Sequence, residues 1–464
     1  MLCVVTTPQD LDERFREAVG ALTASTVRRA PEEPVRDGGT LDGERAQALF
    51  DAQLVSRHLD LAARWLRSFG EGYYTIGSAG HEGNAAVALA VRPTDPALLH
   101  YRSGGFYCAR AAQAAAPGAG GGPDGGRLSH QVGIAERVAQ ALSGQDGSGA
   151  TGPHPTTGVG DPEGASDALL SAARDVLRGV VASADEPVAG GRHKVFGNSA
   201  LAIVPTTSTI GSHLPRAVGL GFAIERQRRR PDARTPGARR PAVGLARSRA
   251  DTGSPWPVDA IVICSFGDAS VNHATAVAAF NTAGWCDHSG LRIPVLFVCE
   301  DNGLGISVRS PEGWVANTLR AKPGIRYFAA DGCDVVETYD VAVEAAAWVR
   351  RHRRPAVLHL STVRLMGHAG ADAEVAYRTS AEIARDLARD PVVATARLLV
   401  EAGLATPEEV IARYDEIGWQ VRKVAEEVIG EPKLDSAADI VAPLAPRRPV
   451  RVARAITEAA NRAA

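Results

Sequence analysis

The sequence predicts an α/β protein built on a parallel β-sheet with helices on both faces, followed by a helical C-terminal region. Strand-like and helix-like segments alternate between residues 259 and 364, which is the pattern of a parallel sheet covered by helices. The composition, 45% hydrophobic and 22% charged, is that of a soluble globular protein. Residues 391–464 show helical patterns only.

The predicted elements follow from local patterns. Apolar residues recur every three or four positions between residues 53 and 69, as in an amphipathic helix. Thr406, followed by proline and two glutamates, is a typical helix start and predicts a helical hairpin near the C-terminus. The other predicted elements are helices over 83–91, 214–229, 270–283 and 339–351 and strands over 260–266, 293–300, 325–331 and 355–364.

The chain divides into three predicted parts. Residues 1–45 are predicted to be a loosely ordered leader, residues 46–390 the main domain, and residues 391–464 the helical region. Glycine, proline, serine and arginine dominate two stretches near 115–165 and 228–257. Because such compositions cannot form a packed layer, we expect flexible insertions there.

Charge, cysteines and hydropathy restrict the possible partners and compartment. The net charge of −2 gives no electrostatic reason to expect nucleic acid or an anionic membrane as a general partner. The six cysteines form no C-x-x-C pair, which favours a reducing compartment. The N-terminus becomes charged too soon for a signal peptide, and no apolar run approaches about 20 residues. We therefore expect a cytoplasmic protein.

Two neighbouring predicted strands end in oxygen-bearing residues. Asp268 follows the first strand directly after Gly267, and Asn302 follows the second, 34 positions later. Ligands of open parallel sheets bind at the carboxyl ends of the strands, so these side chains should meet. A carboxylate, an amide oxygen and a nearby backbone carbonyl suit Mg²⁺, usually together with a diphosphate. The helix that begins at Ser270 would offer backbone N–H groups to that anion.

Five blocks of sequence, in order, resemble one known family. They are YYTIGSAGHEGNAAVALAV (73–91), HYRSGGFY (100–107), TSTIGSHLPRAVGLGFA (207–223), GDASVNHATAVAAFNTA with VLFVCEDNGLGISV (267–308), and RLMGHAGADAEVAYR (364–378). Together they are similar to the α chain of the first, decarboxylating component of thiamine-diphosphate-dependent 2-oxo acid dehydrogenases. The similarity extends from about Gln53 to Pro443 and implies the thiamine-diphosphate-binding fold.

The resemblance implies a set of ligands for Mg²⁺ and for the cofactor. Asp268 and Asn302 would bind Mg²⁺ through their side chains, and Leu304 through its carbonyl. Gly267 and Ala269, on either side of Asp268, would contact the cofactor. Most relatives have glycine at the position of Ala269, and we expect the extra methyl group to be tolerated if φ is negative.

Further positions of the resemblance would hold the organic part of the cofactor. Tyr101 and Arg102 would bind the diphosphate, because an arginine fork matches phosphate oxygens, and Arg364 would add to that grip. Ser208 and the backbone of Ile210 would face the aminopyrimidine.

The resemblance assigns the catalytic position to His368. Its imidazole would lie beside the thiazolium, where it could steer the 2-oxo acid carboxylate or assist acyl transfer to a lipoyl group. Many relatives have a phosphorylatable serine next in sequence, whereas this chain has Ala369, which excludes phosphorylation at that position. His81 and Glu82 could also suggest acid–base chemistry, but we favour a structural role at the start of a helix.

The resemblance implies the α subunit of an α2β2 2-oxo acid dehydrogenase. Its partners would be a β subunit, which carries the family's catalytic glutamate, and a lipoyl-bearing acyltransferase core. The segments HKVFGN (193–198) and TSTIGSHLP (207–215) favour branched-chain substrates such as 3-methyl-2-oxobutanoate by a small margin, with pyruvate or acetoin as alternatives.

Two alternatives of other classes stay open. No β half follows in this sequence, so the chain could be the front of a split fusion and act as a non-catalytic partner. The retained cofactor-binding residues argue against that interpretation. An arginine-rich stretch at residues 226–240 could bind nucleic acid, although a solvated surface loop is the better interpretation because aromatic residues are missing.

Overall fold

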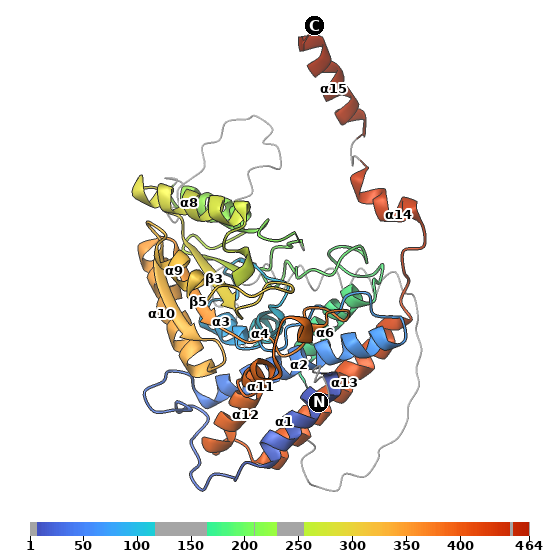
Figure 1. The fold of residues 1–464 in the computed structure, drawn as a ribbon. Coiled ribbons are helices and arrows are strands. Elements are labelled where there is room, and N and C mark those ends of the chain that lie inside the picture. The colour runs from blue at the N-terminus through green and yellow to red at the C-terminus, as the bar shows by residue number, and fades with distance from the viewer. Residues whose placement is uncertain (1–6, 117–164, 208, 230–254, 446–448, 464) are drawn as a thin grey trace, which may run out of the picture.

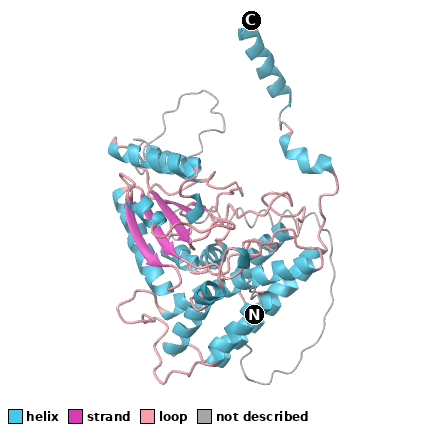
Figure 2. Ribbon diagram, in the orientation of Figure 1, coloured by secondary structure: helices cyan, strands magenta, loops and turns pink. Residues whose placement is uncertain are grey.

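The computed structural model describes residues 7–116, 165–207, 209–229, 255–445 and 449–463. Its described strands form one parallel sheet in the order β1-β2-β3-β5-β4, and helices cover both faces (Figures 1 and 2). The predicted fold class is therefore confirmed. The strands are β1 Ala97–Leu98, β2 Val262–Gly267, β3 Val295–Asp301, β4 Arg326–Asp331 and β5 Ala356–Ser361.

The helices agree with most of the predicted positions. They are α1 Pro8–Gly20, α2 Gly43–Ser68, α3 Asn84–Ala90, α4 Gly104–Ala115, α6 Asp167–Val180, α7 Leu214–Arg228, α8 Ala274–His288, α9 Trp314–Arg320, α10 Val335–His352, α11 Ser380–Leu387, α12 Pro391–Glu401, α13 Pro407–Ile429, α14 Ala437–Val441 and α15 Pro449–Ala463.

The side chains of β3 show how the sheet is buried. Leu296 and Val298 enter a core shared with α2, α3, α4, α10, α12 and α13, whereas Val295, Phe297 and Cys299 enter a second core with α7, α8 and α9. Successive side chains of a strand point to opposite faces, so a strand between two cores is apolar throughout. Polar side chains then follow the carboxyl ends of β2 and β3, at Asp268 and Asn302.

Part of the predicted loosely ordered leader, residues 1–45, is an ordered helix: α1 covers Pro8–Gly20. Thr7 caps α1 with a capping box, and Leu11, Phe15 and Val19 are buried along one face of this helix. The ring of Phe15 stacks on Tyr414 of α13, with 4.2 Å between ring centroids. Three apolar residues at four-residue intervals suffice to dock a helix, even when charged residues separate them. Residues 1–6 lie outside the described part of the chain.

Residues 391–429 share the main core with the preceding domain. Ile417, Val421 and Val424 of α13 are buried in the same core as α2, and Arg413 forms an ion pair with Asp51 across the two helices at 2.6 Å. Figure 1 shows α14 and α15 extending away from this body, and α14 has no buried residue. The predicted insertions fall largely within 117–164 and 230–254, outside the described residues.

No helix in the described ranges has both the length and the apolar content needed to cross a membrane.

Candidate active site

The residues predicted to bind Mg²⁺ lie at the carboxyl ends of two neighbouring strands. Gly267 at the end of β2 is paired with Glu300 of β3, so Asp268 and Asn302 leave the sheet side by side. The hydroxyl of Ser310 donates a hydrogen bond to Asp268 at 2.5 Å, which closes the loop after β3 over the loop after β2. A methyl group built on Gly305 of that loop would lie 3.8 Å from the Cβ of Ala269. The structure therefore brings the two halves of the motif together.

Ala269 adopts a conformation that any residue can adopt. Among the described residues other than glycine, positive φ occurs at Ala182, Ala202 and Arg353, and not at Ala269. The methyl group that replaces the usual hydrogen atom at this position therefore causes no backbone strain.

Asp268 is a buried carboxylate without a cationic partner in the described part of the chain. Its side chain is almost fully buried, and it accepts hydrogen bonds from Ser310 and from the backbone of Ala269. Burial, and then the nearby charge of Asp301, raise the pKa of Asp268 to about 7. A carboxylate destabilised in this way gains from a cation placed beside it.

Asn302 is oriented by a buried pair formed by His81 and Glu300. Nδ1 of His81 lies 2.8 Å from the Glu300 carboxylate, which can only accept, so Nδ1 carries the proton. Burial lowers the pKa of His81, so the ring is neutral near pH 7 and Nε2 accepts the Asn302 amide N–H at 2.8 Å. The amide oxygen of Asn302 is thereby directed away from His81, and it accepts the backbone N–H of Leu304 at 3.0 Å.

Glu300 is held by further donors on its other side. Ser103 donates to Oε1 at 2.9 Å and Asn84 donates to Oε2 at 3.1 Å, and both Glu300 and His81 are fully buried. The pair therefore has a fixed position beneath the strand ends. It is a positioning device that sequence analysis did not predict, although His81 lies within one of the recognised blocks and Glu300 precedes the Asp-Asn pair.

His368 lies against Arg102 and Tyr101. Nη2 of Arg102 donates to Nδ1 of His368 at 3.0 Å, while Nη1 donates to the Gly77 carbonyl at 2.5 Å. The ring of Tyr101 meets that of His368 edge-on, with 6.2 Å between centroids. Burial, and then the charges of Arg102 and Arg364, lower the pKa of His368 to about 4. The imidazole is therefore neutral at pH 7, with the proton on Nε2.

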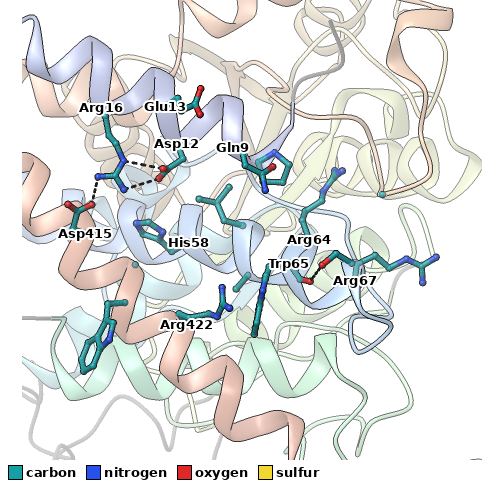
Figure 3. A pocket seen from close by; sticks show the side chains of 17 residues that line it. Gln9, Asp12, Glu13, Arg16, His58, Arg64, Trp65, Arg67, Asp415 and Arg422 are labelled. Carbon is teal, nitrogen blue, oxygen red and sulfur yellow. Dashed lines mark hydrogen bonds and ion pairs between the residues drawn. The ribbon is translucent and has the colours of Figure 1, made fainter. Parts of the chain in front are cut away.

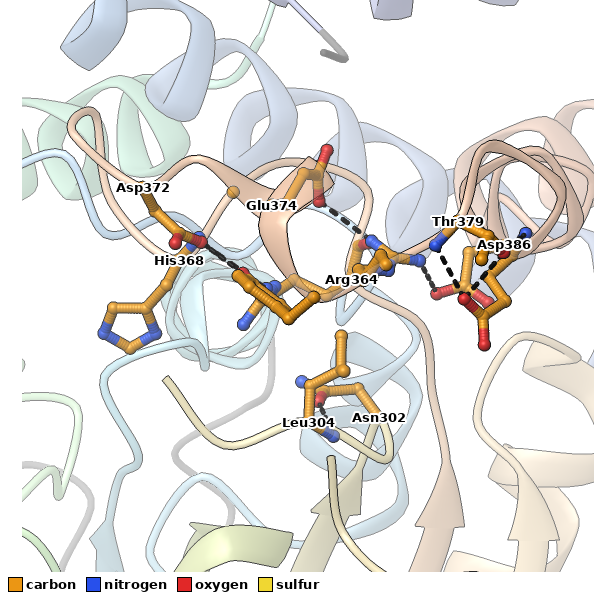
Figure 4. A network of polar contacts seen from close by, with 12 residues as sticks. Asn302, Leu304, Arg364, His368, Asp372, Glu374, Thr379 and Asp386 are labelled. Carbon is orange, nitrogen blue, oxygen red and sulfur yellow. Dashed lines mark hydrogen bonds and ion pairs between the residues drawn. The ribbon is translucent and has the colours of Figure 1, made fainter. Parts of the chain in front are cut away.

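Arg364 connects the loop of His368 to the loop after β3 (Figure 4). Its Nη1 donates to the carbonyls of Gly305 at 3.0 Å and Ile306 at 3.2 Å, and its Nη2 donates to the hydroxyl of Tyr377. Asp372 accepts from this hydroxyl and from the backbone N–H of His368. The buried Nε of Arg364 has no hydrogen-bond partner. In this arrangement Arg364 holds two loops together, and its role toward a diphosphate stays a prediction.

The predicted pyrimidine side lies in a narrow cleft near the start of α7. Tyr101, Ile210, His213 and Ser270 line it, so the structure brings Tyr101, predicted to bind the diphosphate, near Ile210, predicted to face the aminopyrimidine. Gly211 has a φ of +72°, and a methyl group there would lie 2.9 Å from Oγ1 of Thr275. Ser208 lies outside the described residues.

The residues present fit a magnesium–diphosphate group. Asp268, Asn302 and the carbonyl of Leu304 offer hard oxygen atoms, and no cationic side chain of the described residues pairs with Asp268. The described residues contain no group of three or more His, Cys, Asp or Glu side chains able to hold a metal, and the predicted set includes only one carboxylate. A larger cleft, between α1, α2 and α13, does not include these residues.

Comparison with protein families identifies the class of protein. The model of the dehydrogenase E1 component family matches residues 171–436, more than half of the chain. The chain therefore belongs to the dehydrogenase E1 component family, and this membership implies thiamine diphosphate as the cofactor.

Curated relatives specify the subunit that the chain resembles. It is 33% identical over 173 residues to the testis-specific mitochondrial form of the pyruvate dehydrogenase E1 component α subunit of Homo sapiens, covering 36% of this chain and 41% of that protein. Identity to the corresponding mitochondrial α subunit of Dictyostelium discoideum is 25% over 175 residues, 37% and 45% of the two chains. Identity to the type I mitochondrial α subunit of the pyruvate dehydrogenase E1 component of Ascaris suum is 28% over 185 residues, which cover 39% of this chain and 44% of that protein.

The chain thus spans a little less than half the length of these relatives. They support the E1 α type and the pyruvate alternative, and they do not specifically support the branched-chain interpretation.

Proposed function

We propose that this chain is the α subunit of a thiamine-diphosphate-dependent 2-oxo acid dehydrogenase and that it binds the cofactor with Mg²⁺ at the carboxyl ends of β2 and β3. The observation that carries this proposal is the pairing of β2 with β3, which sets the buried carboxylate of Asp268, unpaired with any cationic side chain of the described residues, beside Asn302. Family membership supports the choice of cofactor.

Each residue has a distinct role in this proposal. Thiamine diphosphate, when bound, supplies the electron sink for decarboxylation. Asp268, Asn302 and the Leu304 carbonyl hold Mg²⁺, and Tyr101 and Arg102 supply donors for the diphosphate.

His368 acts on the substrate side. Because its Nδ1 accepts from Arg102, the neutral ring presents Nε2–H as a donor. This donor can hold a substrate carboxylate or give a proton at Nε2, and Arg102 keeps the ring in one tautomer. His368 is half-buried, so part of its ring remains exposed.

We propose pyruvate as the first substrate to test. The named relatives are pyruvate dehydrogenase α subunits, and the segment 193–198 that suggested branched-chain substrates is largely buried. Nζ of Lys194 lies 4.5 Å from the centroid of the Phe196 ring, so this segment packs inside the protein. Packing therefore gives an explanation for this segment other than a substrate preference.

The proposed partners are a β subunit and a lipoyl-bearing acyltransferase core. The non-catalytic alternative would be favoured by loss of cofactor-binding residues, yet Asp268, Asn302, Tyr101, Arg102 and His368 are all retained. For the nucleic-acid alternative, the described Arg228 and Arg229 are both paired with Glu225, and residues 230–240 lie outside the described range.

The test is 2-oxo-acid-dependent dye reduction in the presence of thiamine diphosphate and Mg²⁺. The chain is assayed alone and co-produced with the β-type chain encoded nearest to it, with pyruvate, 3-methyl-2-oxobutanoate, 4-methyl-2-oxopentanoate and acetoin. We expect activity with the partner, highest with pyruvate and lost in Asp268→Ala. Silence with a partner that demonstrably binds would favour the non-catalytic alternative.

A further inference from the structure

A cleft of about 720 Å³ lies between α1, α2 and α13 (Figure 3). This volume is within the range of roughly 300–1,000 Å³ that is common for small-molecule sites. The cleft contains none of the residues assigned above to the cofactor or to Mg²⁺. Of the loop that carries His368, Gly370 is the residue that lines the cleft.

The charges that line the cleft are not balanced. At one end Arg16 bridges α1 and α13, with contacts of 3.1 Å to Asp12 and 2.5 Å to Asp415, so that these two carboxylates are paired (Figure 3). The rest of the lining carries Arg64, Arg67 and Arg422.

These three arginines have no carboxylate partner inside the cleft. Arg64 and Arg67 form no ion pair in the described part of the chain, and Arg422 pairs only with Glu426, which does not line the cleft. Glu13 is the remaining lining carboxylate, and it is exposed. The lining therefore holds four arginines and three carboxylates, and this excess of one positive charge favours an anion.

The floor of the cleft is apolar and ends at His58. Leu61, Ala62 and Trp65 form the floor, and the guanidinium of Arg422 covers the Trp65 ring at 3.1 Å from its centroid. His58 is 8% exposed, and its Nε2 has no hydrogen-bond partner. Burial lowers the pKa of His58 to about 4, while its ring bonds to the backbone of Tyr414. Neutral His58 therefore adds no positive charge to the cleft.

The cleft is mechanically linked to the His368 loop. Nη2 of Arg64 donates to the carbonyl of Gly367 at 3.0 Å, directly before His368, while the buried Nε of Arg64 has no partner. Gly370 lines the cleft, and its N–H donates to the hydroxyl of Thr75 at 2.8 Å. An anion bound to Arg64 offsets the charge of the guanidinium, and this guanidinium holds the loop through its hydrogen bond to the Gly367 carbonyl.

We propose that this cleft is an effector site for a small organic anion, a phosphate or carboxylate with an apolar body, and that its occupation alters the His368 loop. The anion lies against the guanidinium groups of Arg64, Arg67 and Arg422, which line the cleft. The apolar body covers Leu61 and Trp65. This site is separate from the cofactor site, and neither measurement below depends on decarboxylation.

The first test is isothermal titration of the full chain with phenyl phosphate, with inorganic phosphate and phenol as matched probes. We expect saturable binding of phenyl phosphate, and weaker binding of each matched probe. Arg67→Ala and Arg422→Ala should each weaken binding by roughly fivefold or more, since each removes a charged contact. Arg14→Ala, an exposed arginine on α1 outside the cleft, is the control and should leave affinity unchanged.

The second test is hydrogen exchange of residues 364–378 with and without phenyl phosphate. We expect changed exchange in the wild-type chain and in Arg14→Ala, and no change in the Arg67→Ala/Arg422→Ala double variant. Absence of saturable binding below about 10 mM, or equal affinity in the double variant, overturns the site. Binding that leaves the exchange of this segment unchanged overturns the link to the His368 loop.

Discussion

Replacing His81 by phenylalanine tests whether the buried pair with Glu300 holds Asn302 ready for a cation. The change keeps an aromatic ring but removes the Nδ1 donor to Glu300 and the Nε2 acceptor for Asn302, each at 2.8 Å. Glu300 keeps Ser103 and Asn84 as donors, so its carboxylate is still hydrogen-bonded. The main loss falls on the Asn302 amide, whose N–H has no other acceptor among the described residues.

The magnitude follows from that lost partner. A buried donor without an acceptor costs about 1–3 kcal/mol, which is an upper limit for the partly buried Asn302, and the freed amide can turn so that nitrogen replaces oxygen at the cation position. Because about 1.4 kcal/mol corresponds to a factor of ten, we expect Mg²⁺ affinity to fall by roughly 10- to 100-fold. His81→Gln keeps one donor and one acceptor and should recover most of this loss.

The assay is a Mg²⁺ titration of the α–β assembly at saturating thiamine diphosphate, followed by tryptophan fluorescence. Thermal unfolding of each variant provides the control for folding. If His81→Phe is folded and binds Mg²⁺ as tightly as wild type, Asn302 is either not a ligand or not held by His81. Equal losses in His81→Phe and His81→Gln would contradict the assignment of donor and acceptor.

Three further predictions concern stability. His58 is 8% exposed, and burial lowers its pKa to about 4 in the folded chain. In the unfolded chain the imidazole binds a proton below about pH 6.5, so between about pH 6.5 and pH 4 only the unfolded chain is protonated. Stability is therefore lost as pH falls, by about 2 kcal/mol at pH 5. The loss of melting temperature between pH 7 and pH 5 should be smaller in His58→Gln, and equal losses would refute this. Gly83→Ala places a methyl group 1.9 Å from the Gly332 carbonyl and should cost at least about 1–3 kcal/mol in thermal unfolding, whereas Gly219→Ala, with open space around it, should not destabilise. Phe15→Ala should cost about 3–5 kcal/mol in denaturant unfolding, because Phe15 is fully buried; a loss below about 1 kcal/mol would show that α1 is not part of the core.

Much of the sheet could be predicted because its strands lie between two cores. Continuous apolar runs with a helix between them leave few alternatives, so β2, β3, β4 and β5 lie within a few residues of their predicted positions. The helix after Asp268 begins later than predicted, at Ala274, because residues 268–270 form a 3₁₀ turn and His273 supplies the cap. From the sequence alone, a 3₁₀ turn followed by a capping residue is hard to distinguish from the first turn of an α-helix.

The parts that could not be predicted depend on contacts between distant segments. His81 and Glu300 are 219 positions apart. Only the fold shows that Glu300 holds the His81 ring and that His81 in turn orients the Asn302 amide. Arg364 was predicted to face a diphosphate, while its donors are engaged with carbonyls of the loop after β3. The docking of α1 depends on Tyr414, about 400 positions from Phe15 in the chain, which no local pattern records.

The most direct test of the proposed function is isothermal titration of the α–β assembly with thiamine diphosphate, with and without Mg²⁺, in wild type and Asp268→Ala. The account predicts saturable binding, one cofactor for each α chain, that requires Mg²⁺ and is lost in Asp268→Ala while the variant keeps its wild-type melting temperature. Mg²⁺-dependent binding that persists unchanged in Asp268→Ala would contradict the account, because the cation would then be held elsewhere.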